Sequence, residues 1–290
     1  MDSSSCKICE GRSVAIGVKS GAVIKRDFHL VRCESCGYVS VADPCTDYAR
    51  LYDEDYYRGL GADPLVDYAA ELDHPDQTIR HYEWRGLVAL MRGQLGRDKG
   101  LRWLDHGSGA GGLVRYACGV GMDAVGFDTG AFAPRARERG VPMISADELD
   151  ASTNAFDVVT MIEVIEHVVD PIALLRQVAR VLRPGGLLFV TTGNVAPKQR
   201  DVLSWAYVIP DIHVGYFTPR SLSLAYERVG LRVVPGHYGP GWTDILRFKI
   251  LKNLHVRSRS VVEAVLPWPI LARLADRHVG VTAQPMARKP

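Results

Sequence analysis

Four short apolar runs recur through the middle of the chain, separated by stretches of mixed polarity. They lie at 101–104, 122–127, 156–162 and 187–191. Apolar runs of this length are typical of strands buried on both faces of a parallel sheet. Between the last two runs, Pro171 opens a segment with apolar residues at helical spacing, namely Ile172, Leu174, Leu175, Val178 and Leu182. This alternation of strand and helix predicts a doubly wound α/β domain.

A glycine-rich turn follows the first apolar run. It starts after Asp105 and contains Gly107, Ser108, Gly109, Gly111 and Gly112, and the second run ends at Asp128. Glycine allows a sharp turn and a close approach of backbone to a ligand, and the helix that follows offers unpaired N–H groups. A carboxylate at the position of Asp128 can accept two hydrogen bonds from ribose hydroxyls. The pattern predicts a site for a ribose-containing cofactor.

Two cofactors fit this turn. The letters GSGAGG match G-x-G-x-x-G, which indicates a nicotinamide dinucleotide, and they also match D-x-G-x-G-x-G counted from Asp105. A carboxylate at the mouth of the turn repels a pyrophosphate but attracts an ammonium group. S-adenosylmethionine carries an ammonium and a ribose but no phosphate. The charge of Asp105 therefore favours S-adenosylmethionine over the dinucleotide of a Rossmann-like dehydrogenase.

Four segments occur in one order along the chain: LDHGSGAGG, GFD, FDVVTMIEVIEHVVDP and LRPGGLLFVTT. With them the chain resembles the class I S-adenosylmethionine-dependent methyltransferases over residues 76–234. The resemblance implies a Rossmann-like sheet of seven strands with the last one antiparallel. It also implies that Asp147 flanks the adenine and that Glu163 lies beside the transferred methyl group. The implied cofactor-binding residues are Asp105, Gly107, Ser108, Gly109, Gly111, Asp128, Ala146, Asp147 and Glu163.

Two Cys-x-x-Cys pairs near the amino terminus predict a metal site. The pairs are Cys6 with Cys9 and Cys33 with Cys36, separated by 23 residues. Two such knuckles complete a tetrahedron of thiolates around Zn²⁺, and four cysteines leave no coordination position open. The segments 14–18 and 22–31 are expected to pair as strands. The sequence therefore predicts a zinc ribbon whose metal is structural.

A tyrosine-rich segment follows the ribbon. Tyr52, Tyr56 and Tyr57 lie in it, and tyrosines at helical spacing either pack the ribbon against the main domain or line a lid over the acceptor. Here the chain resembles bacterial methyltransferases of sugars and related natural-product intermediates, which carry a Cys-x-x-Cys module followed by such a segment. We predict that Tyr52, Tyr56 and Tyr57 contact the acceptor.

His213 is the candidate general base. It lies in DIHVGYF at 211–217, where the sugar C-methyltransferases have an acid, a histidine, a valine and an aromatic pair. Ile212 stands in place of the acid, so Asp211 is expected to orient the imidazole. The segment 194–217 also holds Trp205, Tyr207 and Tyr216, which suit an acceptor with an apolar or ring face, and Tyr216 is assigned to the acceptor. His167, in the Glu163–Pro171 loop, and His106, in the glycine turn, are the other candidate bases, and a structural role for His213 remains open. Thr218 and Pro219 predict the start of a helix.

Size and composition place limits on the class of protein. The chain has 290 residues, 47% hydrophobic content and a formal net charge of +2, which is typical of a soluble globular protein and gives no general case for nucleic acid. No apolar run approaches the roughly 18 residues that span a bilayer, and no leader pattern precedes the ribbon, so we expect a cytoplasmic protein.

The expected divisions of the chain are a ribbon (1–45), a tyrosine-rich lid (46–76), the methyltransferase domain (77–255) and a helical extension (256–290). Residues 243–251 are expected to form a strand.

These features predict methyl transfer from S-adenosylmethionine to oxygen or carbon of a small molecule, such as a sugar or secondary metabolite, with His213 as the base. Two alternatives come from other classes. One is an RNA methyltransferase that grips RNA with its ribbon, although the basic residues of the ribbon are interspersed rather than clustered. The other is a zinc-ribbon interaction protein without catalytic activity. The intact glycine turn with Asp105 and Asp128 favours the enzyme.

Overall fold

The computed structural model describes residues 5–47, 51, 68–234, 241–260, 265–271, 274 and 285–290. The chain folds into two compact units, each assembled from segments that are distant in sequence. The first unit contains residues 1–53, 147–236 and 284–290, and the second contains 54–146 and 237–283.

The second unit holds the first part of the predicted parallel sheet. Strands β4 (Arg102–His106) and β5 (Asp123–Phe127) pair in parallel, with Asp105 opposite Gly126. Buried aliphatic and aromatic side chains explain these strands, since Trp103 and Leu104 are wholly inaccessible to solvent. The elements of this unit are α3 (Tyr68–Asp73), α4 (Arg80–Leu95), β4 (Arg102–His106), α5 (Gly112–Gly119), β5 (Asp123–Phe127), α6 (Phe132–Glu138) and α10 (Trp242–Asn253).

Helix α10 overturns one expectation, because residues 243–251 form a helix and not a strand. Its side chains Ile245, Leu246, Phe248 and Leu251 are buried, and the helix packs against α4. The two helices approach closely where Gly86 meets Gly241, since a Cβ on Gly86 would lie 2.5 Å from the Gly241 carbonyl oxygen. A short apolar run fits either a strand or a buried helix, and packing against α4 decides for the helix.

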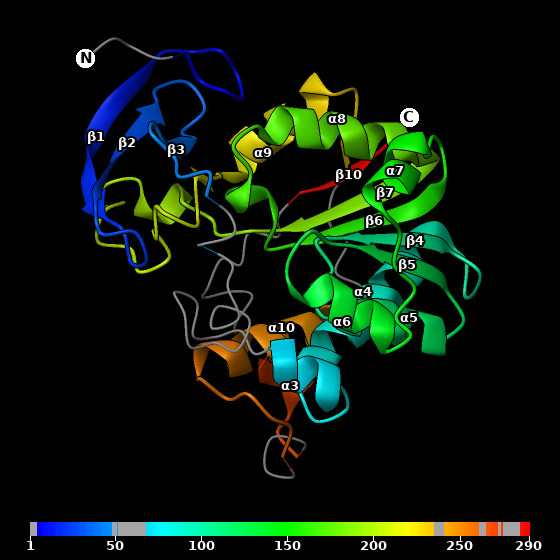
Figure 1. Ribbon diagram of the computed structural model, residues 1–290. Coiled ribbons are helices and arrows are strands. Elements are labelled where there is room, and N and C mark those ends of the chain that lie inside the picture. The colour runs from blue at the N-terminus through cyan, green and yellow to red at the C-terminus, as the bar shows by residue number, and fades with distance from the viewer. Residues whose placement is uncertain are drawn as a thin grey trace. The chain divides into compact units, whose positions relative to one another are not determined.

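The first unit holds the second part of the sheet. Strands β6 (Phe156–Ile162) and β7 (Leu182–Thr191) pair in parallel. β10 (Met286–Arg288) lies between β7 and β9 (Arg232–Val234) and is antiparallel to both. Helices α8 (Pro171–Val181) and α9 (Pro219–Arg228) cover one face of these strands (Figure 1). Parallel strands joined through helices, with a late antiparallel strand, confirm the Rossmann-like class.

The end of the chain differs from the expected helical extension, because residues 286–288 form β10. Met286 and Ala287 are buried in the sheet. Lys289 adds polar contacts, donating from Nζ to the carbonyl oxygens of Ala179 at 2.7 Å and Leu182 at 2.8 Å. The last residues are thus a structural part of the first unit.

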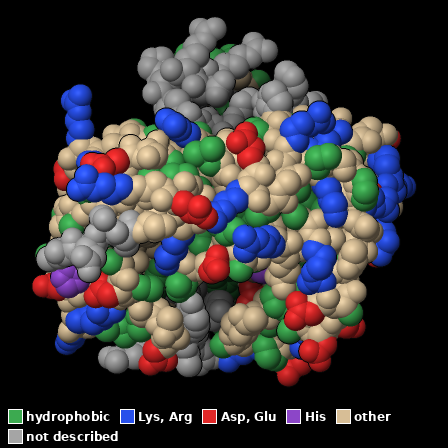
Figure 2. All heavy atoms as spheres, turned by 90° about the horizontal axis from the view of Figure 1, so that it is seen from above, with side chains coloured by type: hydrophobic (Ala, Val, Ile, Leu, Met, Phe, Trp, Pro, Cys, Tyr) green, Lys and Arg blue, Asp and Glu red, His purple; other side chains and the backbone are tan. Residues whose placement is uncertain are grey.

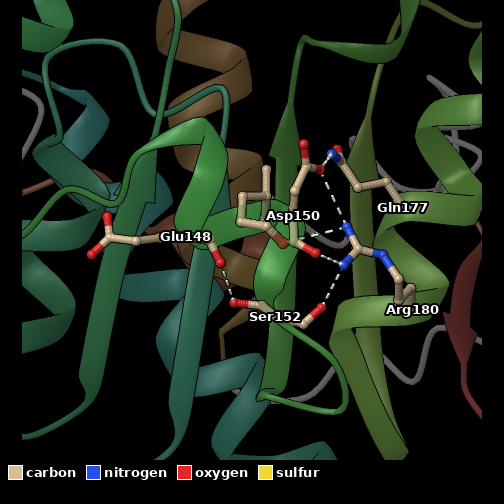
Figure 3. A network of polar contacts seen from close by, with 6 residues as sticks. Glu148, Asp150, Ser152, Gln177 and Arg180 are labelled. Carbon is tan, nitrogen blue, oxygen red and sulfur yellow. Dashed lines mark hydrogen bonds and ion pairs between the residues drawn. The ribbon is translucent and has the colours of Figure 1, made fainter.

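Helix α7 (Ala146–Ala151) is tied to α8 by a polar network (Figure 3). The Arg180 guanidinium donates to the carbonyl oxygens of Asp150 and Ser152, the latter at 2.7 Å. Gln177 donates from Nε2 to Asp150 Oδ1 at 3.1 Å. These contacts satisfy carbonyl groups at the end of α7 that lack helical partners.

The predicted zinc ribbon forms a small antiparallel sheet in the first unit. Its strands are β1 (Ser13–Ser20), β2 (Asp27–Cys33), β3 (Val39–Val41) and β8 (Gly215–Tyr216), in the spatial order β1-β2-β3-β8. The first strand agrees with the predicted 14–18, and the second begins later than predicted because residues 21–26 form the connecting loop. The fourth strand comes from a segment about 175 residues further along the chain, which the sequence analysis did not anticipate.

Charged side chains are dispersed over the face that Figure 2 shows. Lys and Arg side chains alternate there with acidic, apolar and uncharged ones. Among the described residues, no helix is long and apolar enough to cross a membrane.

Candidate active site

The glycine turn has the backbone geometry that its sequence predicted. Gly107, Gly109 and Gly111 all have positive φ angles, of 81°, 53° and 75°. The turn is tightly enclosed, since a Cβ on Gly109 would lie 2.6 Å from the Tyr68 ring and one on Gly111 would lie 2.5 Å from the Val141 side chain. Both positions therefore require glycine for conformation and for space.

Asp128 is held against this turn by its carboxylate. Oδ2 accepts from the backbone N–H of Gly109 at 2.8 Å, and Oδ1 accepts from that of Gly130 at 2.6 Å. The two bonds orient the side chain beside the turn. The role of this carboxylate toward a ribose stays a prediction.

Asp105 and Ser108 are buried next to the same turn. The nearby Arg80 guanidinium lies 3.2 Å from Glu71 and 3.5 Å from Glu83. Burial by itself would lower the pKa of Arg80, but the carboxylates of Glu71 and Glu83 outweigh burial and raise it. The sequence analysis missed this ion cluster and the ring of Tyr68 above Gly109. Charged residues in α3 and in the first turn of α4 were the available signal.

Ala146 and Asp147 occupy the exposed first turn of α7. Their roles toward the adenine stay predictions. His106 is buried, with its ring 5.0 Å from that of Phe127. In the second unit the fold thus gathers Asp105, the glycine turn and Asp128, whereas Glu163, His213 and Tyr216 belong to the first unit.

Glu163 lies directly after β6 and has a φ angle of +53°, a backbone conformation that residues other than glycine seldom adopt. Its backbone N–H donates to the Thr191 carbonyl oxygen at 3.0 Å. The turn directs the carboxylate toward Tyr207, whose hydroxyl lies 2.9 Å from Oε2 of Glu163. Conformations of this kind cluster at functional sites because the surrounding structure has to maintain them.

The Tyr207 hydroxyl is the centre of a polar cluster that the sequence analysis did not assign. It accepts from the Gly193 N–H at 3.0 Å and contacts Glu166 Oε1 at 2.5 Å in addition to Glu163. A phenol carries one proton, so it donates to one carboxylate at a time. The Glu-x-x-Glu-His pattern at 163–167 was the signal in the sequence for this cluster.

Burial sets the protonation of the cluster. Desolvation, and after it the neighbouring carboxylate of Glu163, raises the pKa of Glu166 well above its usual value. Desolvation and the two carboxylates also raise the pKa of Tyr207. A protonated Glu166 can donate to the phenol oxygen, while the phenol donates to Glu163. The raised pKa of Glu166 favours one proton shared between the two carboxyl groups.

Two imidazoles adjoin this cluster. His213 Nδ1 lies 2.7 Å from the Tyr207 carbonyl oxygen, and His167 Nδ1 lies 3.0 Å from the Ile212 carbonyl oxygen. A carbonyl only accepts, so each Nδ1 carries a proton and each neutral ring has its lone pair at Nε2. The rings of His167 and His213 are 4.8 Å apart. His213, Glu163 and the previously unassigned Glu166 and Tyr207 thus meet at one place.

Tyr216 is wholly buried in β8, and its hydroxyl donates to the His213 carbonyl oxygen at 2.7 Å. Its observed contact is therefore with the histidine segment. Tyr52, Tyr56 and Tyr57, which were also assigned to the acceptor, lie outside the described residues. Asp211 was expected to orient the imidazole of His213. Its carboxylate instead accepts from the backbone N–H groups of residues 23 and 24.

Among the described residues, two groups of side chains could hold a metal ion. The four cysteine sulfurs lie within 4.8 Å of one another, and the closest pairs are 3.4 and 3.7 Å apart. A tetrahedral zinc with bonds of about 2.3 Å requires sulfurs separated by about 3.8 Å, so the residues fit a closed structural site. Ligand atoms of Glu166, His167 and His213, one from each residue, also lie within 4.8 Å of one another.

Comparison with known proteins identifies the family. Residues 77–235 match the family described as a methyltransferase domain, which is more than half of the chain. The chain belongs to this family, and with the fold described above it is a class I S-adenosylmethionine-dependent methyltransferase.

The curated relatives are named for one reaction. A protein of Aeromonas salmonicida named ubiquinone biosynthesis O-methyltransferase is 33% identical over 189 residues, which are 58% of this chain and 77% of the relative. One of the same name from Cereibacter sphaeroides is 39% identical over 113 residues, 35% of this chain and 44% of the relative. The match thus spans less than half the length of the second relative.

A solved structure of 1,6-didemethyltoxoflavin-N1-methyltransferase from Burkholderia thailandensis aligns with 70% of this chain and 87% of its own. The identity is 17% and the TM-score is 0.44. Likeness at this level carries no argument about the acceptor.

Proposed function

We propose that the protein transfers a methyl group from S-adenosylmethionine to a hydroxyl oxygen of a small ring-bearing molecule. The observation that carries the proposal is the polar cluster of Glu163, Glu166, Tyr207 and His213, in which Glu166 and His213 are buried and the other two are half-buried. The sulfonium methyl is already activated, so the remaining needs are in-line positioning and removal of the acceptor proton. A group of carboxyl, phenol and imidazole side chains at the end of a central strand suits proton removal.

His213 is our candidate for the base. Its Nδ1 proton is directed to the Tyr207 carbonyl oxygen at 2.7 Å, which favours the tautomer with an unprotonated Nε2. The imidazolium that forms after proton transfer is stabilised by that carbonyl and by the neighbouring carboxyl groups. Asp128, Asp105 and the glycine turn are proposed to hold the ribose, the ammonium and the methionyl part of the cofactor, with Asp147 at the adenine.

The acceptor class is inferred from two observations. The rings of Trp205 and Tyr207 stack with centroids 4.9 Å apart beside the cluster, which suits a molecule with a flat face. The curated relatives bear the name of an O-methyltransferase of ubiquinone biosynthesis. We therefore rank hydroxylated aromatic rings first, and keep sugars and other secondary metabolites as the second class of acceptor.

The test is methyl transfer from radiolabelled S-adenosylmethionine to a panel of catechols, phenols and nucleotide sugars. With an accepted substrate, His213→Asn should lower kcat by about 10²-fold or more, in the range that general bases contribute. Its affinity for S-adenosylmethionine should stay unchanged. The exposed His74→Asn is the matched control and should retain full activity.

Unchanged kcat in His213→Asn would reject His213 as the base. If wild-type protein binds the cofactor and methylates carbon but no hydroxyl, the proposal of an oxygen acceptor is wrong. The assignment of His213 as the base is then tested with the carbon acids that the enzyme methylates. Methylation of RNA alone would favour the alternative in which the ribbon grips nucleic acid, and salt-dependent binding would accompany it.

A second candidate mechanism uses the same cluster with a divalent cation. Glu166, His167 and His213 each present one ligand atom within 4.8 Å of the others, and each imidazole is oriented through Nδ1 by a carbonyl. Carbonyl groups orient metal-binding histidines in this way. A cation held there would acidify an acceptor hydroxyl, and His213 would be a ligand instead of the base.

Cation dependence separates the two mechanisms. If methyl transfer is lost after treatment with EDTA, returns with Mg²⁺, Mn²⁺ or Co²⁺, and is equally sensitive to His167→Asn and His213→Asn, the cation mechanism holds. If activity survives EDTA and only His213→Asn is inactive, the base mechanism holds. Zinc retained by the cysteines is measured in the same samples, so that loss of the ribbon metal is recognised.

A further inference from the structure

One strand of the zinc ribbon comes from the segment that carries His213. β8 begins two residues after His213 and pairs with β3, with Val39 opposite Tyr216. The Val41 N–H also donates to the Val214 carbonyl oxygen at 3.0 Å. The backbone on the carboxyl side of the imidazole is therefore an edge strand of the ribbon sheet.

The backbone on the amino side of His213 is also fixed by the ribbon. The fully buried Asp211 carboxylate accepts from the N–H groups of Val23 at 2.5 Å and Ile24 at 2.9 Å, in the loop between β1 and β2. A Cβ at Gly21 would lie 2.9 Å from Asp211 Oδ2, so the loop closes tightly around this carboxylate. Ile212, which follows, supplies the carbonyl that orients His167.

The cysteine knuckles contact both ends of the segment at 194–218. Thr218 donates from Oγ1 to the Cys36 carbonyl oxygen at 3.0 Å, and Gln199 donates from Nε2 to the Gly37 carbonyl oxygen at 2.8 Å. Both acceptors belong to the knuckle of Cys33 and Cys36. The geometry of the zinc site thus sets the positions of these anchors.

An apolar cluster joins the ribbon and the segment between these anchors. It combines buried residues of β2 and β3 with buried residues of the segment, namely Leu30, Val39, Val195, Val202, Val208 and Tyr216. The partly buried Trp205 and Tyr207 pack against this cluster. Lys19 on β1 donates to the carbonyl oxygens of Leu203 at 2.8 Å and Trp205 at 3.1 Å. Strands of the ribbon therefore support the stacked aromatic pair and the phenol of the polar cluster.

We infer that the zinc ribbon is a positioning device for the acceptor side of the active site, and that its zinc holds the Tyr207–Tyr216 segment in its working geometry. The edge of β3, which a ribbon could offer to a partner, is already occupied by β8. The glycine turn and Asp128 belong to the other unit. Loss of zinc should therefore disable the acceptor side and leave cofactor binding intact. The inference rests on the proposed function only for its activity readout.

The test uses the full chain with and without zinc, which is released by a thiol-directed mercurial and quantified by a colorimetric indicator. Hydrogen exchange of amides in 207–217 should accelerate after zinc release, while amides of β4 and β5 remain protected. Calorimetry should give the same affinity for S-adenosylmethionine before and after release. Slow exchange in 207–217 without zinc, or loss of cofactor binding together with zinc, overturns the inference.

A variant that leaves the cysteines intact separates positioning from folding. Asp211→Ala should retain one zinc per chain and its cofactor affinity, exchange faster at 212–217, and lower kcat by about tenfold or more, as a misplaced catalytic group does. Asp211→Asn keeps an acceptor oxygen and should restore part of the loss. Asp201→Ala, in the same segment but exposed, is the control.

If no acceptor is methylated even by wild type, the proposed function fails, while exchange and cofactor binding still decide the role of the ribbon. Wild-type exchange at 212–217 in Asp211→Ala overturns the inference.

Discussion

At the scale of single residues, the proposed ribose-binding role of Asp128 depends on one carboxylate and its immediate neighbours. Its two bonds to Gly109 and Gly130 hold it beside the glycine turn. Asp128→Ala removes the group proposed to bind the ribose hydroxyls, so S-adenosylmethionine should bind at least about tenfold more weakly, equivalent to about 1.4 kcal/mol. Titration calorimetry measures this, with Asp123→Ala, at the exposed start of β5, as the control. Equal affinities for the two variants would contradict the assignment.

His81 gives a pH-dependent prediction. Burial, and after it the charges of Arg259 and Arg85, lowers the pKa of this imidazole below its usual value of 6.5. Below pH 6.5 the unfolded chain therefore takes up the proton before the folded one does, and the free energy of unfolding should fall as the pH drops. His81→Phe keeps a ring against Tyr116, whose centroid is 5.2 Å away. Urea unfolding between pH 5 and 7 should show a weaker pH dependence for this variant, and equal slopes would refute the prediction.

At the scale of elements, the start of α9 follows local rules. Thr218 accepts from the Ser221 N–H at 2.9 Å, Ser221 completes a capping box, and Pro219 occupies the first turn, so this helix start was predicted correctly. Thr218→Ala should lower the free energy of unfolding by about 1 kcal/mol or more. Thr218→Ser retains the hydroxyl and should keep most of the stability. Chemical unfolding that ranks the two variants equally would exclude a capping role.

Elements differ in how well the sequence predicted them. β6 and α8 were predicted from an apolar run bounded by polar residues and from Pro171 opening a segment of helical apolar spacing. α10 was mistaken for a strand because its short apolar stretch fits either element, and its packing against α4 decides for the helix. Local pattern therefore suffices where it is long or capped, and tertiary contact decides where it is short.

At the scale of the whole molecule, cofactor binding should raise thermal stability. A ligand that binds only the folded state at 100 times its Kd adds about 2.7 kcal/mol to the free energy of unfolding. S-adenosylmethionine should therefore raise the melting temperature of wild type in a concentration-dependent way, and that of Asp128→Ala far less. Differential scanning fluorimetry measures both. A melting temperature that does not respond to the cofactor would contradict the proposed site.

The sequence by itself determined the α/β class, the glycine turn with Asp105 and Asp128, the four cysteines and the histidine segment. Each of these is encoded within a short window, where glycine conformation, thiolate spacing and strand burial act on neighbouring residues. Only the tertiary structure decided that Tyr207 joins Glu163 to Glu166, that His167 faces His213, and that β8 completes the ribbon. These contacts join residues 40 to 180 positions apart. Such pairs leave no periodic signal in the chain, because their energy comes from burial and hydrogen bonding that exist only after folding.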